Sequence, residues 1–358
     1  VLLGGDFGVN PWCRGTTFAA IANTLTYTAD RFFAVGGASP SINVSRQAIA
    51  AGDISNAGNT FAQALQFART AANANTAVLN LGQVLESTNS IPLQGSQVTL
   101  SFWAKAGANF SAAGGFLGVQ VVTGTGTDQS AANLVAGSWT GQSVRPLFTM
   151  ANGTVNIGSN AGGNPTTGLV GGVVLTPANG VPVTTVWQRF QLTCSIPANA
   201  TQIGVLWNYT PVGTAGANDW VQFAGMQLEQ VAPLYPFASA FEYRRAGIEL
   251  MLCQRYATSW AEPAATVAIA PGQATGAAAQ KITLPLATQM RVAPTVTIPV
   301  AGTFRINVAG TPTAVTLAGA TSTPSTAVVT GGATNTAGQA VLLEGNGGAG
   351  LIVASAEL

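Results

Sequence analysis

Hydrophobic and polar residues alternate with a period of two in several segments of the first two thirds of the chain. In the segment 98–103, Val98, Leu100 and Phe102 share one parity, while Trp103 has the other parity together with polar residues. The segments 190–196 and 202–209 alternate in the same way, and Gly-, Asn- and Pro-rich stretches separate them. Such strands place one parity on a core and the other on a second surface. The pattern predicts an antiparallel β-sandwich over residues 1–240.

One of these segments changes parity along its length. Val221 and Phe223 are apolar at odd positions, and Met226 and Leu228 continue the apolar series at even positions. Gly225 stands at the change. An extra residue in one strand shifts the parity in this way, so we predict a β-bulge at Gly225.

A single helix is predicted, between Tyr243 and Tyr256. Ile248, Leu252 and Tyr256 recur at the spacing i, i+4, i+8, with Met251 beside that stripe, which indicates an amphipathic helix packed on a core. We therefore divide the chain into a sandwich (1–240), a connecting helix (241–256) and a C-terminal β domain (257–358). Residues 140–182 are the least regular part of the sandwich and are interpreted as a long loop or an extra hairpin.

The last hundred residues are rich in Ala, Gly, Thr and Val, and no Trp or Tyr follows Trp260. The runs 281–286, 295–299 and 351–355 are predicted strands. Because such small side chains bury little apolar area in one copy, we expect this domain to be completed by contacts between copies, as an oligomerisation or tip domain.

The composition of the chain excludes several classes of function. The chain has 358 residues, no histidine, a net charge of +1 and only 7% charged residues. Catalysis by Ser-His-Asp or Cys-His and His-ligated zinc are excluded. No basic field is present that would gather nucleic acid, and no apolar run approaches the roughly 18 residues that span a bilayer. We expect no nucleic-acid partner, no membrane insertion and no cofactor.

Two acidic residues lie in similar glycine-rich loops, Asp128 in 124–128 and Asp219 in 213–219. Together they could form a glycosidase-type carboxylate pair or a structural calcium site at one end of the sandwich. Turn chemistry alone also explains both, since Asp side chains bond to nearby backbone in turns. The turn interpretation is preferred, so no catalytic residue is assigned and the metal content stays open.

An ordered series of short motifs resembles a family of tailed-bacteriophage virion proteins, usually labelled tail fibre or structural protein. The motifs are Leu2–Phe7, Asn10–Trp12, Tyr27–Arg31, Leu81–Gln83 with Glu86, Val98–Gly107, Trp187–Phe190, Gly213–Trp220, Met226–Glu229, Arg244–Arg245, Glu249–Leu250, Leu252–Tyr256, Met290–Pro294 and Ala354–Leu358. They span nearly the whole chain. The resemblance implies a location on the virion surface, and it implies that the first domain is a jelly roll similar to carbohydrate-binding modules.

From this resemblance we expect a non-enzymatic fibre subunit, of tail or head, that binds host-surface glycan. The alternatives are a capsid decoration or head-fibre protein with a purely structural role and, less favoured, a glycan depolymerase. The resemblance does not assign binding residues to this chain. The expected partners are other virion proteins, host polysaccharide and two further copies of the chain, because fibres of this kind are usually homotrimers.

Three residues are candidates for glycan binding. Trp103 has the parity opposite to Leu100 and Phe102, so it should point away from the core, and Trp220 is likewise opposite to Val221. A flat aromatic ring offers a sugar an apolar platform, and a polar neighbour such as Lys105 can bond to hydroxyls. Both rings could instead be covered by loops or by neighbouring subunits.

Overall fold

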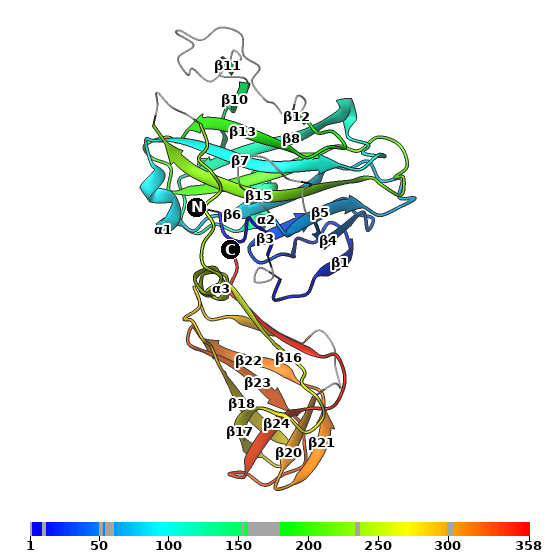
Figure 1. The fold of residues 1–358 in the computed structure, drawn as a ribbon. Helices are drawn as coiled ribbons and strands as arrows, with labels where there is room; N and C mark the ends of the chain where they lie inside the picture. Colours follow the sequence, from blue (N-terminus) through cyan, green and yellow to red (C-terminus); the bar gives the residue numbers. More distant parts are fainter. Residues whose placement is uncertain are drawn as a thin grey trace. The chain divides into compact units, whose positions relative to one another are not determined.

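The computed structural model describes residues 2–8, 12–49, 53, 61–151, 154–156, 180–232, 237–298 and 304–358, and for 148–151 and 154–156 the backbone only. The chain forms two compact units, one comprising 1–244 with Leu358 and the other 245–357. Both are built almost entirely of antiparallel strands (Figure 1). The all-β prediction is confirmed.

Unit 1 is a two-layered sandwich with jelly-roll connections. Its first sheet has the order β1 (Thr17–Ile21), β4 (Ile42–Ala48), β5 (Gln63–Arg69), β15 (Trp220–Val231), β7 (Gln97–Ala106), β13 (Gln188–Ser195), β10 (Phe148–Ala151) and β11 (Thr154–Asn156). The second has the order β12 (Val181–Pro182), β8 (Phe116–Gly124), β14 (Gln202–Tyr209), β6 (Leu79–Val84), β3 (Phe32–Val35) and β2 (Thr26–Tyr27), with β9 (Ser143–Val144) beside β8. From β6 to β15 the long strands alternate between the two sheets, as in a jelly roll.

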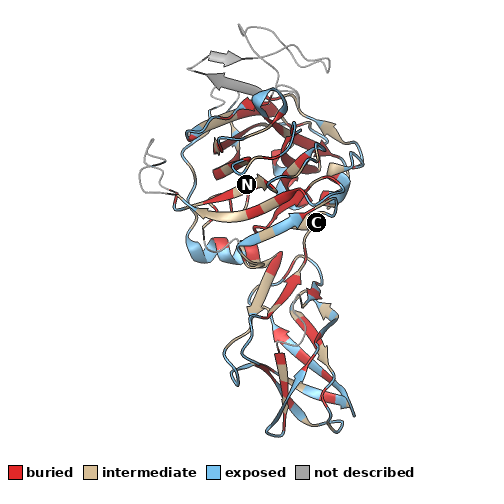
Figure 2. Cartoon of the chain, turned by 90° about the vertical axis from the view of Figure 1, so that its right-hand side faces the viewer, coloured by how far each residue is buried: buried red, intermediate tan, exposed pale blue. Residues whose placement is uncertain are grey.

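The core lies between these sheets and is formed by the side chains that the alternation in the sequence predicts to be buried. Leu100, Phe102 and Trp207 are fully buried in one apolar cluster, in which the Phe102 and Trp207 rings meet edge to face at 5.8 Å. Figure 2 shows the buried residues filling the interior of the sandwich. Cys194 belongs to this cluster, and burial raises the pKa of its thiol to about 12. It is a core residue, as the sequence predicts.

A second apolar layer covers the far side of β14. Gly204 and Leu206 of β14 lie against Leu134 of the short helix α2 (Ala131–Val135) and against Trp139, which follows that helix. Every residue of β14 is therefore buried.

Unit 2 contains two sheets and a core of its own. The small sheet has the order β16 (Ala257–Ala261), β25 (Leu351–Ser355) and β19 (Thr295–Thr297). The large sheet has the order β21 (Thr311–Val315), β20 (Phe304–Val308), β24 (Ala340–Gly345), β17 (Ala268–Gly276), β18 (Ala279–Pro285), β23 (Thr326–Gly331) and β22 (Ala318–Thr323). Ile282, Leu284, Phe304 and Ile306 are fully or almost fully buried in one cluster. The small side chains thus still enclose an apolar core within a single copy.

The helix prediction needs correction. The helix α3 spans Ala246–Gln254, and Ile248 and Met251, which the pattern assigns to the core-facing stripe, are 52% and 58% exposed. Glu249 and Cys253 are the buried positions. Short helices also occur in loops of unit 1, namely α1 (Ser87–Ser90), η1 (Ile91–Leu93), η2 (Ala113–Gly115) and α2. They are too short to produce a sequence period.

The predicted irregular region contains a hairpin, because β10 and β11 pair in antiparallel register. Residues 152–153 and 157–179 of that region lie outside the described residues, as do Asn10, Pro11 and Pro299 of the motifs and runs named above.

The bulge in β15 is confirmed. The pairing of β15 with β7 changes register between Ala224 and Gln227, and Gly225 has a φ of 58°. A Cβ on Gly225 would lie 2.4 Å from Cζ of Phe61, so the glycine is needed both for its backbone conformation and for the space that the ring occupies.

We expect Gly225→Ala to destabilise unit 1 more than Gly213→Ala. Both glycines have positive φ, but a Cβ on Gly213 meets nothing within 4 Å. In the control, Gly213→Ala, stability should fall only by the cost of holding alanine in the left-handed backbone conformation, about 1–2 kcal/mol. Gly225→Ala adds displacement of Phe61, typically about 1–3 kcal/mol for an overpacked site. Urea unfolding of both variants measures the difference, and equal losses would contradict the packing role of Gly225.

Candidate functional site

The outer face of the first sheet, the face turned away from the core, carries the aromatic candidates. Phe102 and Val221 belong to the core cluster, whereas Trp103 and Ala224 belong to a separate cluster on the other side of the sheet. The predicted orientation of Trp103 is therefore confirmed. Trp220 has the same parity as Ala224 and is half-buried.

A covering segment, residues 237–243, lies over one half of the outer face. Its backbone amides donate hydrogen bonds to side chains of β13 and β15. The amide of Ala238 donates to Gln191 Oε1 at 2.9 Å, and that of Ser239 donates to Glu229 Oε1 at 2.9 Å. Further along, the amide of Glu242 donates to Gln227 Oε1 at 2.8 Å. The polar side chains of this half of the sheet are thus used to hold the segment.

The covering segment removes Trp103 as a sugar platform. Trp103 is 6% exposed in a cluster with Phe61 and Trp187, and Phe241 of the covering segment packs against that cluster. The Phe61 and Phe241 ring centroids are 5.2 Å apart. The expectation of an open sheet face at Trp103 is therefore wrong, because the chain supplies its own cover there.

A row of polar side chains crosses the other half of the outer face. Strand register places Ser45 of β4, Gln66 of β5, Gln222 of β15 and Lys105 of β7 side by side. Adjacent strands are about 4.8 Å apart, so the row extends about 14 Å across the sheet. Gln222 Nε2 donates to Gln66 Oε1 at 2.9 Å, and all four side chains are half-buried. Sequence reasoning did not find Ser45, Gln66 and Gln222, although Gln66 alternates with the core residues Leu65 and Phe67.

Trp220 flanks this row. It pairs with Ala68 of β5, whose methyl group is too small to cover the indole, and Trp220 is half-buried. On the other side, a Cβ on Gly107 would lie 2.7 Å from Cε2 of Trp220, so the indole rests directly over the Gly107 backbone. The ring is therefore held in position by its own sheet while part of it remains accessible.

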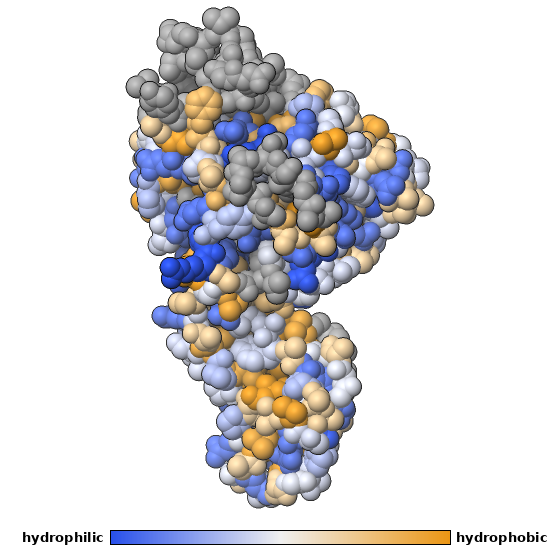
Figure 3. Space-filling model, in the orientation of Figure 1, coloured by the Kyte–Doolittle hydropathy of each residue, from blue (hydrophilic) through white to orange (hydrophobic). Residues whose placement is uncertain are grey.

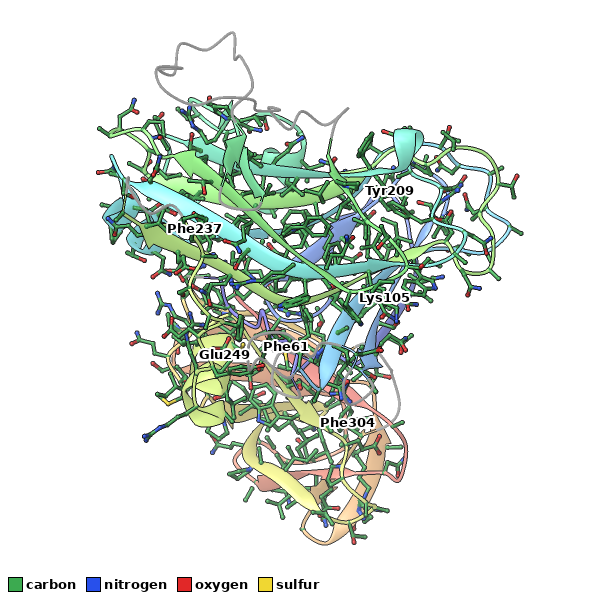
Figure 4. The ribbon with its side chains drawn as sticks, turned by 45° about the horizontal axis from the view of Figure 1, so that its top comes forward. Phe61, Lys105, Tyr209, Phe237, Glu249 and Phe304 are labelled. Carbon is green, nitrogen blue, oxygen red and sulfur yellow. The ribbon has the colours of Figure 1, made fainter. Side chains whose placement is uncertain are left out.

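Lys105 is also held in place at the end of the row. Its Nζ is 5.9 Å from the centroid of the Trp187 ring and 3.6 Å from Asp53 Oδ2, with the Lys105 side chain 26% exposed. In Figure 4, Lys105 and Phe237 of the covering segment lie toward opposite ends of the sandwich. Figure 3 shows that hydrophilic residues predominate on the visible described surface of unit 1.

Asp219 is part of a buried ion pair. Its Oδ2 is 3.0 Å from Nη1 of Arg69, and both side chains are 0% exposed. Arg69 Nη2 also donates to the carbonyl oxygens of Asn73, Asn75 and Gly213. Ser111 completes the network, donating from its amide and its hydroxyl to the carboxylate of Asp219 at 3.1 and 2.6 Å. Asp219 therefore fixes loops at one end of the sandwich.

Asp128 lies at the other end. Its Oδ1 accepts the amide of Ser87 at 2.8 Å, at the first turn of α1, and its own amide donates to the Ser87 hydroxyl at 2.9 Å. The next residue, Gln129, donates to Gln202 at the start of β14, whereas the charge of Asp219 acts on Tyr209 at the end of that strand.

The alternative of a carboxylate pair, which the sequence left open, is therefore wrong. The two acids lie near opposite ends of β14, whose eight residues span about 23 Å, whereas the carboxylates of glycosidases are roughly 5–9.5 Å apart. Each carboxylate instead serves its own loop, as the turn interpretation predicts.

Within the described ranges, no group of three or more His, Cys, Asp or Glu side chains is placed to hold a metal ion. No described helix has the length and hydropathy to cross a bilayer.

Comparisons with known proteins give distant similarities. No family model matches the sequence, and no curated protein matches it. Among solved structures, the chain is similar to the enzymatically active domain of tailspike protein 4 of bacteriophage CBA120, with a TM-score of 0.28 and 11% identity over 56% of this chain and 19% of that chain. It is also similar to a CBM4 structure, with a TM-score of 0.23 and 14% identity over 53% of this chain and 87% of that chain. At these TM-scores, neither similarity carries an argument about function.

We expect Asp219→Asn to destabilise the protein by about 3–5 kcal/mol, because it leaves the buried Arg69 guanidinium without its counter-charge. Asp128→Asn keeps a side-chain oxygen for the Ser87 amide and should cost only about 1 kcal/mol, comparable to the loss of a helix cap. Thermal or urea unfolding measures both. A loss for Asp219→Asn no larger than for Asp128→Asn would contradict the structural role of the ion pair.

Proposed function

We propose that the chain is a subunit of a bacteriophage surface appendage, a tail or head fibre, and that its first unit binds host-surface glycan. The observation that carries the proposal is the half of the outer face over which the described residues place no covering segment, called here the uncovered half. There the positioned Trp220 ring flanks the row Ser45–Gln66–Gln222–Lys105. Sugar-binding sites combine such a ring with a few convergent polar groups. The virion assignment is supported by the series of sequence motifs described above.

We further propose that the chain binds glycan without cleaving it. The separation of Asp128 from Asp219, and the use of each by its own loop, supports this proposal. A purely structural decoration protein is the alternative, and it predicts no glycan affinity.

We expect Trp220→Ala to lower affinity for host-surface polysaccharide by about tenfold, which corresponds to the roughly 1–1.5 kcal/mol of one well-placed aromatic contact. Phe116→Ala is the matched control, because Phe116 is an aromatic residue of the other sheet and is 36% exposed. Calorimetry with purified host polysaccharide gives both affinities, after circular dichroism confirms folding.

Equal affinity of Trp220→Ala and the unmodified chain would contradict the proposed site. If reducing ends are released during incubation, and Asp128→Ala or Asp219→Ala abolishes the release, the non-enzymatic proposal fails.

The proposed oligomer is a homotrimer. Unit 2 has an apolar core within one copy, so the argument that it needs neighbouring copies for a core does not support the trimer. The proposal is supported instead by the family resemblance and by the exposed apolar side chains of α3. Ile248 and Met251 stand one turn apart on this helix and leave an apolar strip that self-association would bury.

We expect light scattering at micromolar concentration to give three times the chain mass of 36.1 kDa. The double change Ile248→Glu with Met251→Glu should reduce this mass by introducing charge into the contact. Val186→Glu, at a position 68% exposed in unit 1, is the control. A single species of one chain mass in the unmodified protein would contradict the trimer.

A further inference from the structure

The uncovered half of the outer face carries no unpaired charge among its described residues. Its cation is Lys105, and Asp53 lies 3.6 Å away from it. In the covered half, Arg189 interacts with Glu229 and donates to the carbonyl of Ser239. Each positive group on the face is therefore matched by a negative group of the same chain.

Side-chain amides occupy the middle of the row. The single bond between Gln222 Nε2 and Gln66 Oε1 uses one donor and one acceptor of the pair. An amide carries two N–H donors and an oxygen with two lone pairs. The pair therefore keeps donors on Gln66 and an acceptor on Gln222. A sugar hydroxyl both donates and accepts, so a hydroxyl placed over the pair can use both groups.

We propose that this half of the outer face is selective for uncharged, hydroxyl-rich glycans over acidic ones. The inference rests on the proposed glycan-binding function and specifies its ligand class. A uronate or phosphate group over the row would have to separate Lys105 from Asp53, or lie beside Asp53 as a like charge. Either arrangement is unfavourable, whereas hydroxyl groups require neither.

The experiment measures affinities of the full chain for neutral glucan, galactan and mannan oligosaccharides and for polyuronate oligosaccharides of matched length. At least one neutral series should bind more tightly than the polyuronates. Its affinity should change by no more than about twofold between low and high salt, because screening acts on charged contacts.

Two substitutions test the residues that carry the inference. Gln66→Ala combined with Gln222→Ala should lower neutral-glycan affinity by about tenfold, as expected for the loss of two hydrogen bonds. The matched control is Gln273→Ala in unit 2, since Gln273 is exposed and pairs with Lys281 across β17 and β18 as Gln222 pairs with Lys105.

Asp53→Asn should raise polyuronate affinity by about fivefold, because it frees the charge of Lys105, and should leave neutral-glycan affinity unchanged. Asp53 is 43% exposed, so the change should not affect folding.

The outcomes separate the two proposals. No binding to any oligosaccharide overturns the proposed function and the inference with it. Preferred, salt-sensitive binding of polyuronates keeps the glycan-binding function but overturns the selectivity for uncharged glycans. Neutral binding that persists in the Gln66→Ala/Gln222→Ala variant overturns the role of the amide pair.

Discussion

The ion pair between Arg69 and Asp219 is the constraint on which one end of the sandwich depends. Both charges are fully buried, so the guanidinium must find all its hydrogen-bond acceptors within the protein. Nη1 and Nη2 find theirs, and Nη2 joins the backbone of Asn73 and Asn75 in the loop after β5 to that of Gly213 in the loop before β15, while Nε has no partner among the described residues. Because Asp219 immediately precedes Trp220, the same network fixes the start of β15 and the position of the indole beside the polar row.

The two halves of the outer face meet at the bulge in β15, where the strand changes parity. Before Gly225, the outward positions include Trp220 and Gln222, which stay half-buried. After it, Gln227 and Glu229 bond to the covering segment, and Phe61 packs over the glycine. A chain that covers part of its own sheet satisfies polar groups there and limits where a ligand can lie. Among the described residues, the covering segment does not extend over the half that carries the polar row.

The period-two pattern predicted the strands that matter most. Since successive strand residues point to opposite faces, the parity of Leu100 and Phe102 fixed the core side of β7, and the parity change at Gly225 fixed the bulge. Strand parity also correctly predicted that Trp103 and Trp220 point away from the core. The helical spacing i, i+4 did not place Ile248 correctly in α3, because only tertiary packing decides which side of a short helix is buried, and there Glu249 rather than Ile248 is covered.

The sequence by itself therefore determined the all-β architecture, the orientation of the outer-face aromatics and the scarcity of catalytic groups. Only the tertiary structure decided which aromatic residue is accessible and which acids meet. The cluster that contains Trp103 is covered in part by Phe241, more than a hundred positions away in the chain, and Asp128 and Asp219 stand near opposite ends of β14 despite their similar loops. Local pattern fixes the face on which a side chain lies, but strand order and register fix its neighbours, and these depend on contacts between distant segments.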